Sequence, residues 1–122
     1  MLIGYSGQLG SEIIKIINDR KSFLQHENFV FIKVNSSKLD IVNKDSVLSY
    51  ISDTKPNIII NCAAYTNVDQ AEEDYEKAFQ VNSLGARNLA IAAESVGAKL
   101  IHISTDYVFD GKGVIVNDKK VP

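Results

Sequence analysis

Residues 4–10 read GYSGQLG and follow a short apolar run at residues 1–3, and this junction decides the fold. Glycine is needed where a backbone turns tightly or approaches a ligand without an intervening Cβ atom. Residues 11–20 carry isoleucines at helical spacing with polar and charged residues between them, so a helix should begin near Gln8. A glycine loop between a strand and a helix is typical of dinucleotide sites, because the helix N-terminus attracts the pyrophosphate.

The rest of the chain alternates short apolar runs with longer amphipathic ones. Strands are expected at residues 1–3, 29–34, 58–60 and 100–104. Further helices are expected at 45–54 and at 69–96, the second broken near 73–75 and closed by Gly97. This alternation implies parallel pairing with right-handed crossovers. The sequence therefore predicts an α/β fold with a doubly wound parallel sheet, in which ligands bind beyond the carboxyl ends of the strands.

The composition is that of an ordinary globular domain, with 122 residues, 45% hydrophobic and 23% charged. A net charge of −2 argues against nucleic acid or an anionic membrane as a partner. No apolar stretch approaches the ~20 residues of a membrane span, and the N-terminus does not resemble a signal peptide. The single cysteine, Cys62, excludes an internal disulfide and fits a reducing compartment, so we expect a cytoplasmic protein.

The end of the second expected strand bears on the choice of dinucleotide. Dinucleotide folds place an acid there for the adenosine ribose, or basic residues for a 2′-phosphate. Residues 33–38 read KVNSSK, without an acid, which leans towards NADPH and leaves NADH open; Asn35 is the candidate contact. Asp40 and Ile41 follow. The carboxylate would accept from the adenine amino group and the isoleucine would cover the ring, or Asp40 simply begins a turn.

Small and then polar side chains follow the third expected strand, in residues 61–69, NCAAYTNVD. Ala63 and Ala64 would let a flat cofactor lie close to the backbone, although tight packing explains two alanines equally well. The polar groups beside them are Tyr65, Thr66 and Asp69.

Three further residues have an ordinary structural interpretation. Cys62 is expected to be a buried small hydrophobe rather than a nucleophile. His102 lies inside the fourth expected strand and is expected to be a packed or hydrogen-bonded core residue. Asn82 lies within the long helical segment, where it is either exposed or faces the strand ends and orders a water molecule.

Five segments taken together resemble the N-terminal part of the dTDP-4-dehydrorhamnose reductases, a family of the extended short-chain dehydrogenase/reductase group. They are GYSGQLG, LDI, NCAAYTNVDQAEED, FQVNSLGARNLA and ISTDYVFDGKG, and the resemblance runs from Gly4 to about Gly113. It implies reduction of the 4-keto group of dTDP-6-deoxy-L-lyxo-4-hexulose to dTDP-L-rhamnose with NADPH or NADH, in cell-surface polysaccharide synthesis. It also implies a dTDP-sugar substrate and a possible homodimer of the full-length protein. Mg²⁺ is linked to the family by resemblance only, and the sequence offers no ligand cluster for it.

The residues and the resemblance together define the candidate sites. The expected cofactor-binding residues are Gly4, Gly7, Gln8, Leu9, Gly10, Asn35, Asp40, Ile41, Ala63, Ala64, Tyr65 and Asn82. Thr105 matches the Ser/Thr of the family's catalytic triad, which implies a hydrogen bond to the substrate carbonyl. The expected substrate-binding residues are Thr66, Asp69, Thr105, Asp106 and Tyr107.

The proton donor of the family does not occur in these residues. A hydride that reaches a ketone carbon leaves charge on the oxygen, so a donor is needed, and the family uses Tyr-x-x-x-Lys. The residues four positions after the five tyrosines are Leu9, Thr54, Asp69, Phe79 and Gly111. We therefore expect an inactive chain, an incomplete NAD(P)-binding domain over residues 1–122 that lacks the C-terminal substrate domain.

Two alternatives stay open. One is a non-catalytic, NADP-binding regulatory subunit of the same family, and the other is a bare nucleotide-binding module. In each case residues 100–104 would form an apolar sheet edge, which predicts self-association or marginal stability of the isolated chain.

Overall fold

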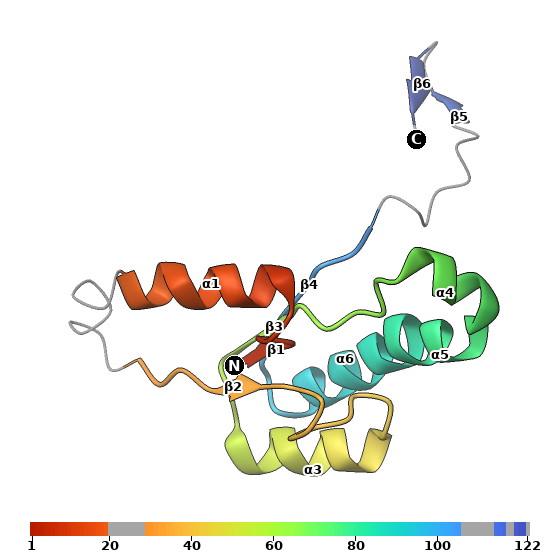
Figure 1. Ribbon diagram of the computed structural model, residues 1–122. Helices are drawn as coiled ribbons and strands as arrows, with labels where there is room; N and C mark the ends of the chain where they lie inside the picture. The colour runs from red at the N-terminus through yellow and green to blue at the C-terminus, as the bar shows by residue number, and fades with distance from the viewer. Residues whose placement is uncertain (20–28, 106–113, 117–118, 122) are drawn as a thin grey trace.

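The computed structural model describes residues 1–19, 29–105, 114–116 and 119–121 (Figure 1). In chain order the elements are β1 (Leu2–Ile3), α1 (Gln8–Asp19), β2 (Lys33–Val34), α3 (Lys44–Thr54), β3 (Ile58–Asn61), α4 (Val68–Glu73), α5 (Tyr75–Phe79), the π-helical turn η1 (Gln80–Gly85), α6 (Ala86–Ser95), β4 (Lys99–His102), β5 (Val114–Val116) and β6 (Lys119–Val121). Among these residues, four strands form one parallel sheet in the order β2-β1-β3-β4, and β5 pairs with β6 in an antiparallel hairpin.

The sheet is doubly wound, as the sequence predicts. The chain passes from β1 outward to β2, then returns across β1 to β3 and continues to β4, so the direction of winding reverses between β1 and β3. Helix α1 covers one face of the sheet, whereas α3 and α6 cover the other (Figure 1). In such sheets the reversal leaves a crevice at the carboxyl ends of the two strands, which is where ligands bind.

Strands β2 and β4 are shorter than the hydrophobic runs that predict them, whereas β3 extends one residue further, to Asn61. Strand β2 contains only Lys33–Val34 of the expected 29–34, because its neighbour β1 offers two residues, Leu2 and Ile3, as partners. Strand β4 is Lys99–His102 rather than 100–104, because its partner β3 ends at Asn61, opposite His102. A strand extends only as far as a neighbour can receive its hydrogen bonds, and the neighbour's length is not encoded in the strand itself.

The helices begin and end at local signals. Asn43 caps α3 by accepting a hydrogen bond from the backbone N–H of Ser46 at 3.0 Å, and the left-handed Lys55 ends it. Helix α1 begins at Gln8, directly after the second glycine of the loop. The long helical segment breaks at Asp74, inside the predicted interval, and contains a π-helical turn that the sequence analysis did not predict.

The hydrophobic core lies between the sheet and the pair α3–α6. Its members come from three strands, from the loop before α3 and from both helices: Ile3, Val34, Leu39, Ile41, Val47, Ile51, Ile59, Leu89, Ala92 and Ala93. The opposite row of the sheet, where Leu2 pairs with Ile60 and Ile60 with Ile101, faces α1. Burial falls along this row, from the fully buried Leu2 to Ile101, whose side chain is 49% exposed. Helix α1 therefore covers β1 well and leaves β4 apolar and open.

Candidate functional site

The first and third glycines of the loop are required by the protein's own packing. Gly4 has a φ of 76°, and a Cβ atom there would lie 2.5 Å from the backbone nitrogen of Ala63 on the neighbouring strand end. A Cβ atom at Gly10 would overlap the backbone of Gly4 and Tyr5. These two glycines therefore bring the strand ends and the first turn of α1 into direct contact at the reversal between β1 and β3.

The middle glycine, Gly7, is different. It is exposed and its φ is outside the left-handed region. A Cβ atom there would meet only the carbonyl oxygen of Gly4, at an ordinary contact distance of 3.5 Å. Within the described residues, neither conformation nor packing explains the glycine. The space beside Gly7 lies at the N-terminus of α1, where the first N–H groups have no partner within the helix.

The end of β3 is held by a buried amide. Asn61 is 1% exposed, and its Oδ1 accepts a hydrogen bond from the backbone N–H of Ala63 at 3.0 Å. Its Nδ2 lies 3.0 Å from Nδ1 of His102 on β4. The prediction for His102 is therefore right about the hydrogen bond and wrong about the core, because this side chain is exposed at the sheet edge.

The loop after β3 is tied to the π-helical turn. The Asn82 side chain accepts from the backbone N–H of Tyr65 at 2.8 Å and donates to the carbonyl of the same residue at 3.1 Å. Asn82 is exposed, and both of its polar side-chain atoms contact the backbone of Tyr65; its role beside a cofactor stays a prediction. The Tyr65 ring has the Lys77 ammonium 5.9 Å from its centroid.

In the loop after β2, Asp40 begins a turn, and its expected contact with the adenine stays a prediction. The exposed Asp40 accepts a hydrogen bond from the backbone N–H of Val42 at 3.0 Å, as in an Asx turn. Ile41 is only 6% exposed and belongs to the core, so its side chain has little surface left to cover an adenine ring. Asn35 also stabilises a local turn, in which its side chain accepts from the Ser37 hydroxyl at 2.8 Å.

The remaining candidates lie beyond the ends of β3 and β4. Thr66 and Asp69 are exposed, Asp69 being in the first turn of α4, and Thr105 is exposed three residues after β4. Asp106 and Tyr107 lie outside the described residues. Gln8 and Leu9 form the exposed first turn of α1, and Ala64 is exposed next to the half-buried Ala63.

Two kinds of chemistry receive no support from the geometry. Burial raises the pKa of the Cys62 thiol above its ordinary value, so the thiol stays protonated at neutral pH and is a poor nucleophile. Within the described part of the chain, no group of three or more His, Cys, Asp or Glu side chains could hold a metal ion.

None of the helices described in the structure is both long enough and apolar enough to cross a bilayer.

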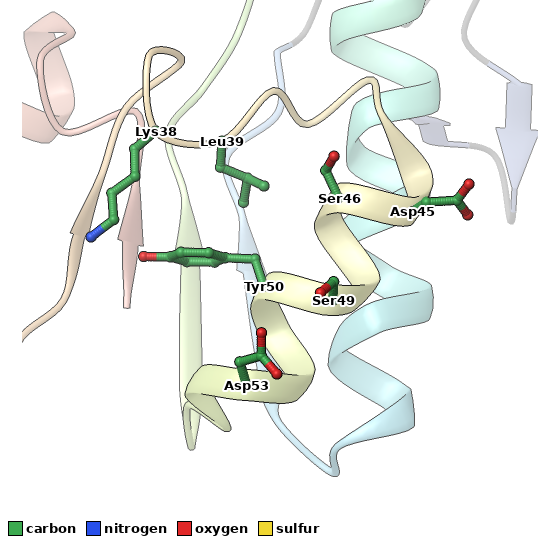
Figure 2. Close-up of a pocket in the computed structure, with 7 residues that line it drawn as sticks. All are labelled: Lys38, Leu39, Asp45, Ser46, Ser49, Tyr50 and Asp53. Atoms are coloured by element: carbon green, nitrogen blue, oxygen red, sulfur yellow. The ribbon is translucent and has the colours of Figure 1, made fainter.

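A separate cavity of about 480 Å³ lies on the outer surface of α3 (Figure 2). It is lined by Lys38, Leu39, Asp45, Ser46, Ser49, Tyr50 and Asp53. The Lys38 ammonium lies 5.6 Å from the centroid of the Tyr50 ring. None of the glycine-loop or β3-end residues lines it, so this cavity is distinct from the strand ends at the reversal between β1 and β3.

The sequence analysis missed two features that shape the site. One is the pair formed by Asn61 and His102, which become neighbours only through the register of β3 and β4. The other is Asn88, which is buried and donates to the carbonyls of Ile41 and Val42 at 3.0 and 3.1 Å. An asparagine beside Leu89 on an apolar helix face was a visible signal for a buried hydrogen bond.

The reversal between β1 and β3 and the glycine loop packed into it define a Rossmann-like NAD(P)-binding domain. The chain belongs to the RmlD substrate binding domain family, whose model matches residues 1–121. A dTDP-4-dehydrorhamnose reductase from Aggregatibacter actinomycetemcomitans is 44% identical over 111 residues, which cover 91% of this chain and 36% of that protein. The chain thus spans little more than a third of this relative's length.

Solved structures of proteins named dTDP-4-dehydrorhamnose reductase have the same fold as this chain. A dTDP-4-dehydrorhamnose reductase from Clostridium acetobutylicum superposes with a TM-score of 0.78 at 42% identity, covering 99% of this chain and 42% of that one. A dTDP-4-dehydrorhamnose reductase from Bacillus anthracis, solved in complex with NADP, superposes with a TM-score of 0.78 at 41% identity, covering 91% and 37%.

Proposed function

We propose that this chain is the cofactor-binding part of an NADPH-dependent dTDP-4-dehydrorhamnose reductase. The reaction would reduce the 4-keto group of dTDP-6-deoxy-L-lyxo-4-hexulose and give dTDP-L-rhamnose. Membership of the family and the reductase names of the relatives support the reaction class, and the bound NADP of the Bacillus anthracis structure supports the cofactor.

The single observation that carries the proposal is Gly7. Gly4 and Gly10 are explained by the protein's own packing, whereas Gly7 is exposed and has room for a Cβ atom. A glycine without an internal reason, at the N-terminus of a helix, is expected where a pyrophosphate must approach the backbone closely. The loop therefore fits a dinucleotide, with Gly7, Gln8 and Leu9 beside the phosphates.

The other residues of the proposed site follow from their place in the fold. Ala63, Ala64 and Tyr65, at the end of β3, would flank the ribose–nicotinamide half of the cofactor. Asp40 and Ile41 would border the adenine half, chiefly through their backbone, since the Ile41 side chain is buried.

The preference for NADPH has its own support, on the outer strand β2. The Lys33 ammonium lies 5.8 Å from the centroid of the Tyr5 ring, which places a positive charge next to the glycine loop. Residues 33–38 contain no carboxylate that would repel a 2′-phosphate or bind a 2′-hydroxyl.

The chemical step needs a hydride for the ketone carbon, a hydrogen bond to the ketone oxygen and a proton donor for that oxygen. Bound NADPH would supply the hydride, and Thr105 would donate a hydrogen bond to the ketone oxygen on which charge develops. The proposed dTDP-sugar contacts are Thr66, Asp69, Asp106 and Tyr107. No tyrosine of the 122 residues is followed four positions later by lysine, so we expect cofactor binding without turnover from this chain alone.

The lack of a Tyr-x-x-x-Lys pattern in the 122 residues also favours a second candidate, a non-catalytic NADP-binding regulatory subunit of the family. The two candidates predict different activities for a longer form of the protein. A reductase that gains a Tyr-x-x-x-Lys segment would oxidise NADPH when the dTDP-4-keto sugar is added, whereas a regulatory subunit would bind NADPH without turnover at any length.

Titration calorimetry of the 122-residue chain tests the cofactor claim directly. We expect one NADPH per chain, bound more tightly than NADH, and no NADPH oxidation in the presence of the keto sugar. Absence of binding to both dinucleotides would overturn the proposed function.

A further inference from the structure

Strand β2 forms one outer edge of the sheet. In the order β2-β1-β3-β4 it is the outermost strand, and within the described residues no strand pairs with its outer side. The carbonyls of Ile32 and Val34 accept hydrogen bonds at 2.8 Å from the N–H groups of β1 and of the residue that follows it. In a parallel pair of this register, the N–H and C=O of the intervening Lys33 point away from β1. The backbone of Lys33 therefore points towards the open edge.

The residues that lead into β2 continue the alternation of a strand. Residues 29–34 read FVFIKV. The rings of Phe29 and Phe31 stack with their centroids 6.2 Å apart, so these two side chains lie on the same side of the chain. The side chains of Ile32 and Val34 pack against the core instead. The segment thus presents alternate side chains to opposite faces, which is the arrangement that pairing with another strand requires.

This edge is unusually apolar and exposed. Val30 is 80% exposed, the highest value among the large apolar side chains that the structure describes, and Phe29 is 53% exposed. Proteins commonly protect a sheet edge with charges or prolines, because an unprotected apolar edge pairs with another strand. Residues 29–32 contain neither a charge nor a proline. The edge therefore has the composition of a pairing surface.

A second copy of the same segment is complementary to this edge. In an antiparallel pair with its two-fold axis at Phe31, that residue faces its own copy. Phe29 then faces Lys33 of the second copy, and Val30 faces Ile32 of the second copy. Because the axis relates the two strands, each of these two unlike pairs forms twice.

The cross-strand pairs of this register are chemically favourable. Val30 and Ile32 would cover each other with β-branched side chains, which pair well across strands. Phe29 and Lys33 would place an ammonium group against an aromatic ring. Lys33 already makes a contact of this kind within the chain, 5.8 Å from the centroid of the Tyr5 ring.

The neighbouring registers are less favourable. With the axis at Lys33, two ammonium groups would face each other, and like charges directly opposite are destabilising. With the axis at Ile32, Val30 would face Val34, which is fully buried and has no surface left to offer. The register centred on Phe31 is therefore the one that covers the most exposed side chain and keeps the charges apart.

We propose that residues 29–34 form a homodimer contact, in which the β2 edges of two copies pair antiparallel about Phe31. The contact joins two four-stranded sheets into one continuous sheet. It does not rest on the proposed function, since it uses the outer side of β2 and not the reversal between β1 and β3. It is also separate from the open face of β4, which lies at the opposite edge of the sheet.

Sedimentation velocity on the 122-residue chain tests the contact. Every chain carries Ile101→Lys, which removes an exposed apolar side chain at the opposite edge. We expect this background chain to be in a monomer–dimer equilibrium. Adding Val30→Lys should weaken the dimer at least about tenfold, because two symmetry-related apolar pairs are lost at once. Adding Ile16→Lys is the matched control, since Ile16 is 57% exposed on α1, and it should leave the dissociation constant unchanged.

Cysteine cross-linking tests the register. In a chain with Cys62→Ala, Phe31→Cys would place two thiols on facing residues, whose Cα atoms lie about 5.5 Å apart, within the span of a disulfide. Phe29→Cys is the matched control, because it would lie four residues from its own copy, about 13 Å along the strands. We expect mild oxidation to give a covalent dimer of the first variant and none of the second.

Each result bears on the proposal in one direction. A background chain that is monomeric at every concentration overturns the homodimer contact. So does a dimer that Val30→Lys, folded by circular dichroism, weakens no more than Ile16→Lys does. Equal cross-linking of the two cysteine variants overturns the register centred on Phe31. NADPH binding is measured separately by calorimetry, so a failure of the proposed function leaves these outcomes unchanged.

Discussion

The buried amide of Asn61 donates a hydrogen bond to Nδ1 of His102 across 3.0 Å, and this bond fixes both side chains. The direction follows from the other end of the amide, because Oδ1 of Asn61 already accepts from the backbone N–H of Ala63, which can only donate. Nδ1 of His102 is therefore an acceptor. The pair connects the ends of β3 and β4, and Ala63, in the proposed nicotinamide half of the site, depends on it.

The first prediction concerns the proton of this pair. We expect neutral His102 to be in the tautomer that carries its proton on Nε2, because Nδ1 accepts from the amide. Long-range ¹H–¹⁵N NMR correlations distinguish the two tautomers. We expect Asn61→Ala to lower the free energy of unfolding by about 1–3 kcal/mol in urea titrations, because the half-buried backbone N–H of Ala63 loses its acceptor.

Asn57→Ala, at an exposed position just before β3, is the matched control and should change stability by less than about 0.5 kcal/mol. A Nδ1–H tautomer, or equal costs for the two asparagine changes, would contradict the account of this pair.

The second prediction separates the glycines of the loop. Gly7→Ala should leave the free energy of unfolding within about 1 kcal/mol of the wild type, because the Cβ atom has room and alanine restricts the unfolded chain. The same change should abolish measurable NADPH binding, because the methyl group would occupy the space of a pyrophosphate. Gly4→Ala should prevent folding, since strain and overlap cost about 3 kcal/mol or more.

Circular dichroism in urea and NADPH fluorescence measure the two quantities. A Gly7→Ala chain that binds NADPH as the wild type does would remove the main support for the dinucleotide site.

The third prediction concerns the choice between NADPH and NADH. Lys33→Glu should weaken NADPH binding about fivefold more than NADH binding, because a screened charge interaction is worth at most about 1 kcal/mol. Lys38→Glu is the matched control, since Lys38 lies over Tyr50 beside α3 and away from the glycine loop. Equal effects of the two substitutions on the ratio of affinities would rule out Lys33 as a determinant of cofactor choice.

The fourth prediction concerns Cys62, whose pKa is raised from its ordinary value of 9.0 by burial. Above pH 9.0 the unfolded chain loses the thiol proton while the folded chain keeps it, so unfolding is favoured as pH rises through this range. The free energy of unfolding should therefore decrease as the pH rises above 9.0. Cys62→Ala should remove the contribution of this thiol to the decrease. Alkylation by iodoacetamide near neutral pH should be slower than in the urea-unfolded chain; equal rates would contradict the burial argument.

The fifth prediction follows from the open face of β4. Ile101 is 49% exposed, and Ile58 on β3 and Ile103 just after β4, both 43% exposed, lie on the same side of their chain segments at this edge of the sheet. We expect the 122-residue chain to self-associate, and Ile101→Lys to weaken the association in sedimentation velocity experiments. Ile16→Lys changes an equally apolar side chain that is 57% exposed on α1 and should have a smaller effect. A wild-type monomer at every concentration tested would refute the prediction.

Much of the fold was predictable because its signals are local. The glycine loop, the amphipathic helices and the break at Asp74 depend on neighbouring residues, and the structure confirms them. The lengths of β2 and β4 were predicted too long, because each strand ends where its partner ends. The π-helical turn was missed, since its residues are compatible with an ordinary helix.

The sequence by itself determined the doubly wound topology and the loops in which a ligand site is expected, because spacing and glycine placement act over a few residues. The resemblance of five segments to known reductases indicated the family. Tertiary structure alone decided which groups of the protein the candidate side chains contact. It assigned Asn82 to the backbone of Tyr65, buried Ile41 under Gly85 and left Gly7 without an internal reason to be glycine. These relationships join residues far apart in the chain, and the physical quantities that fix them, register and close packing, exist only once the sheet and helices are assembled.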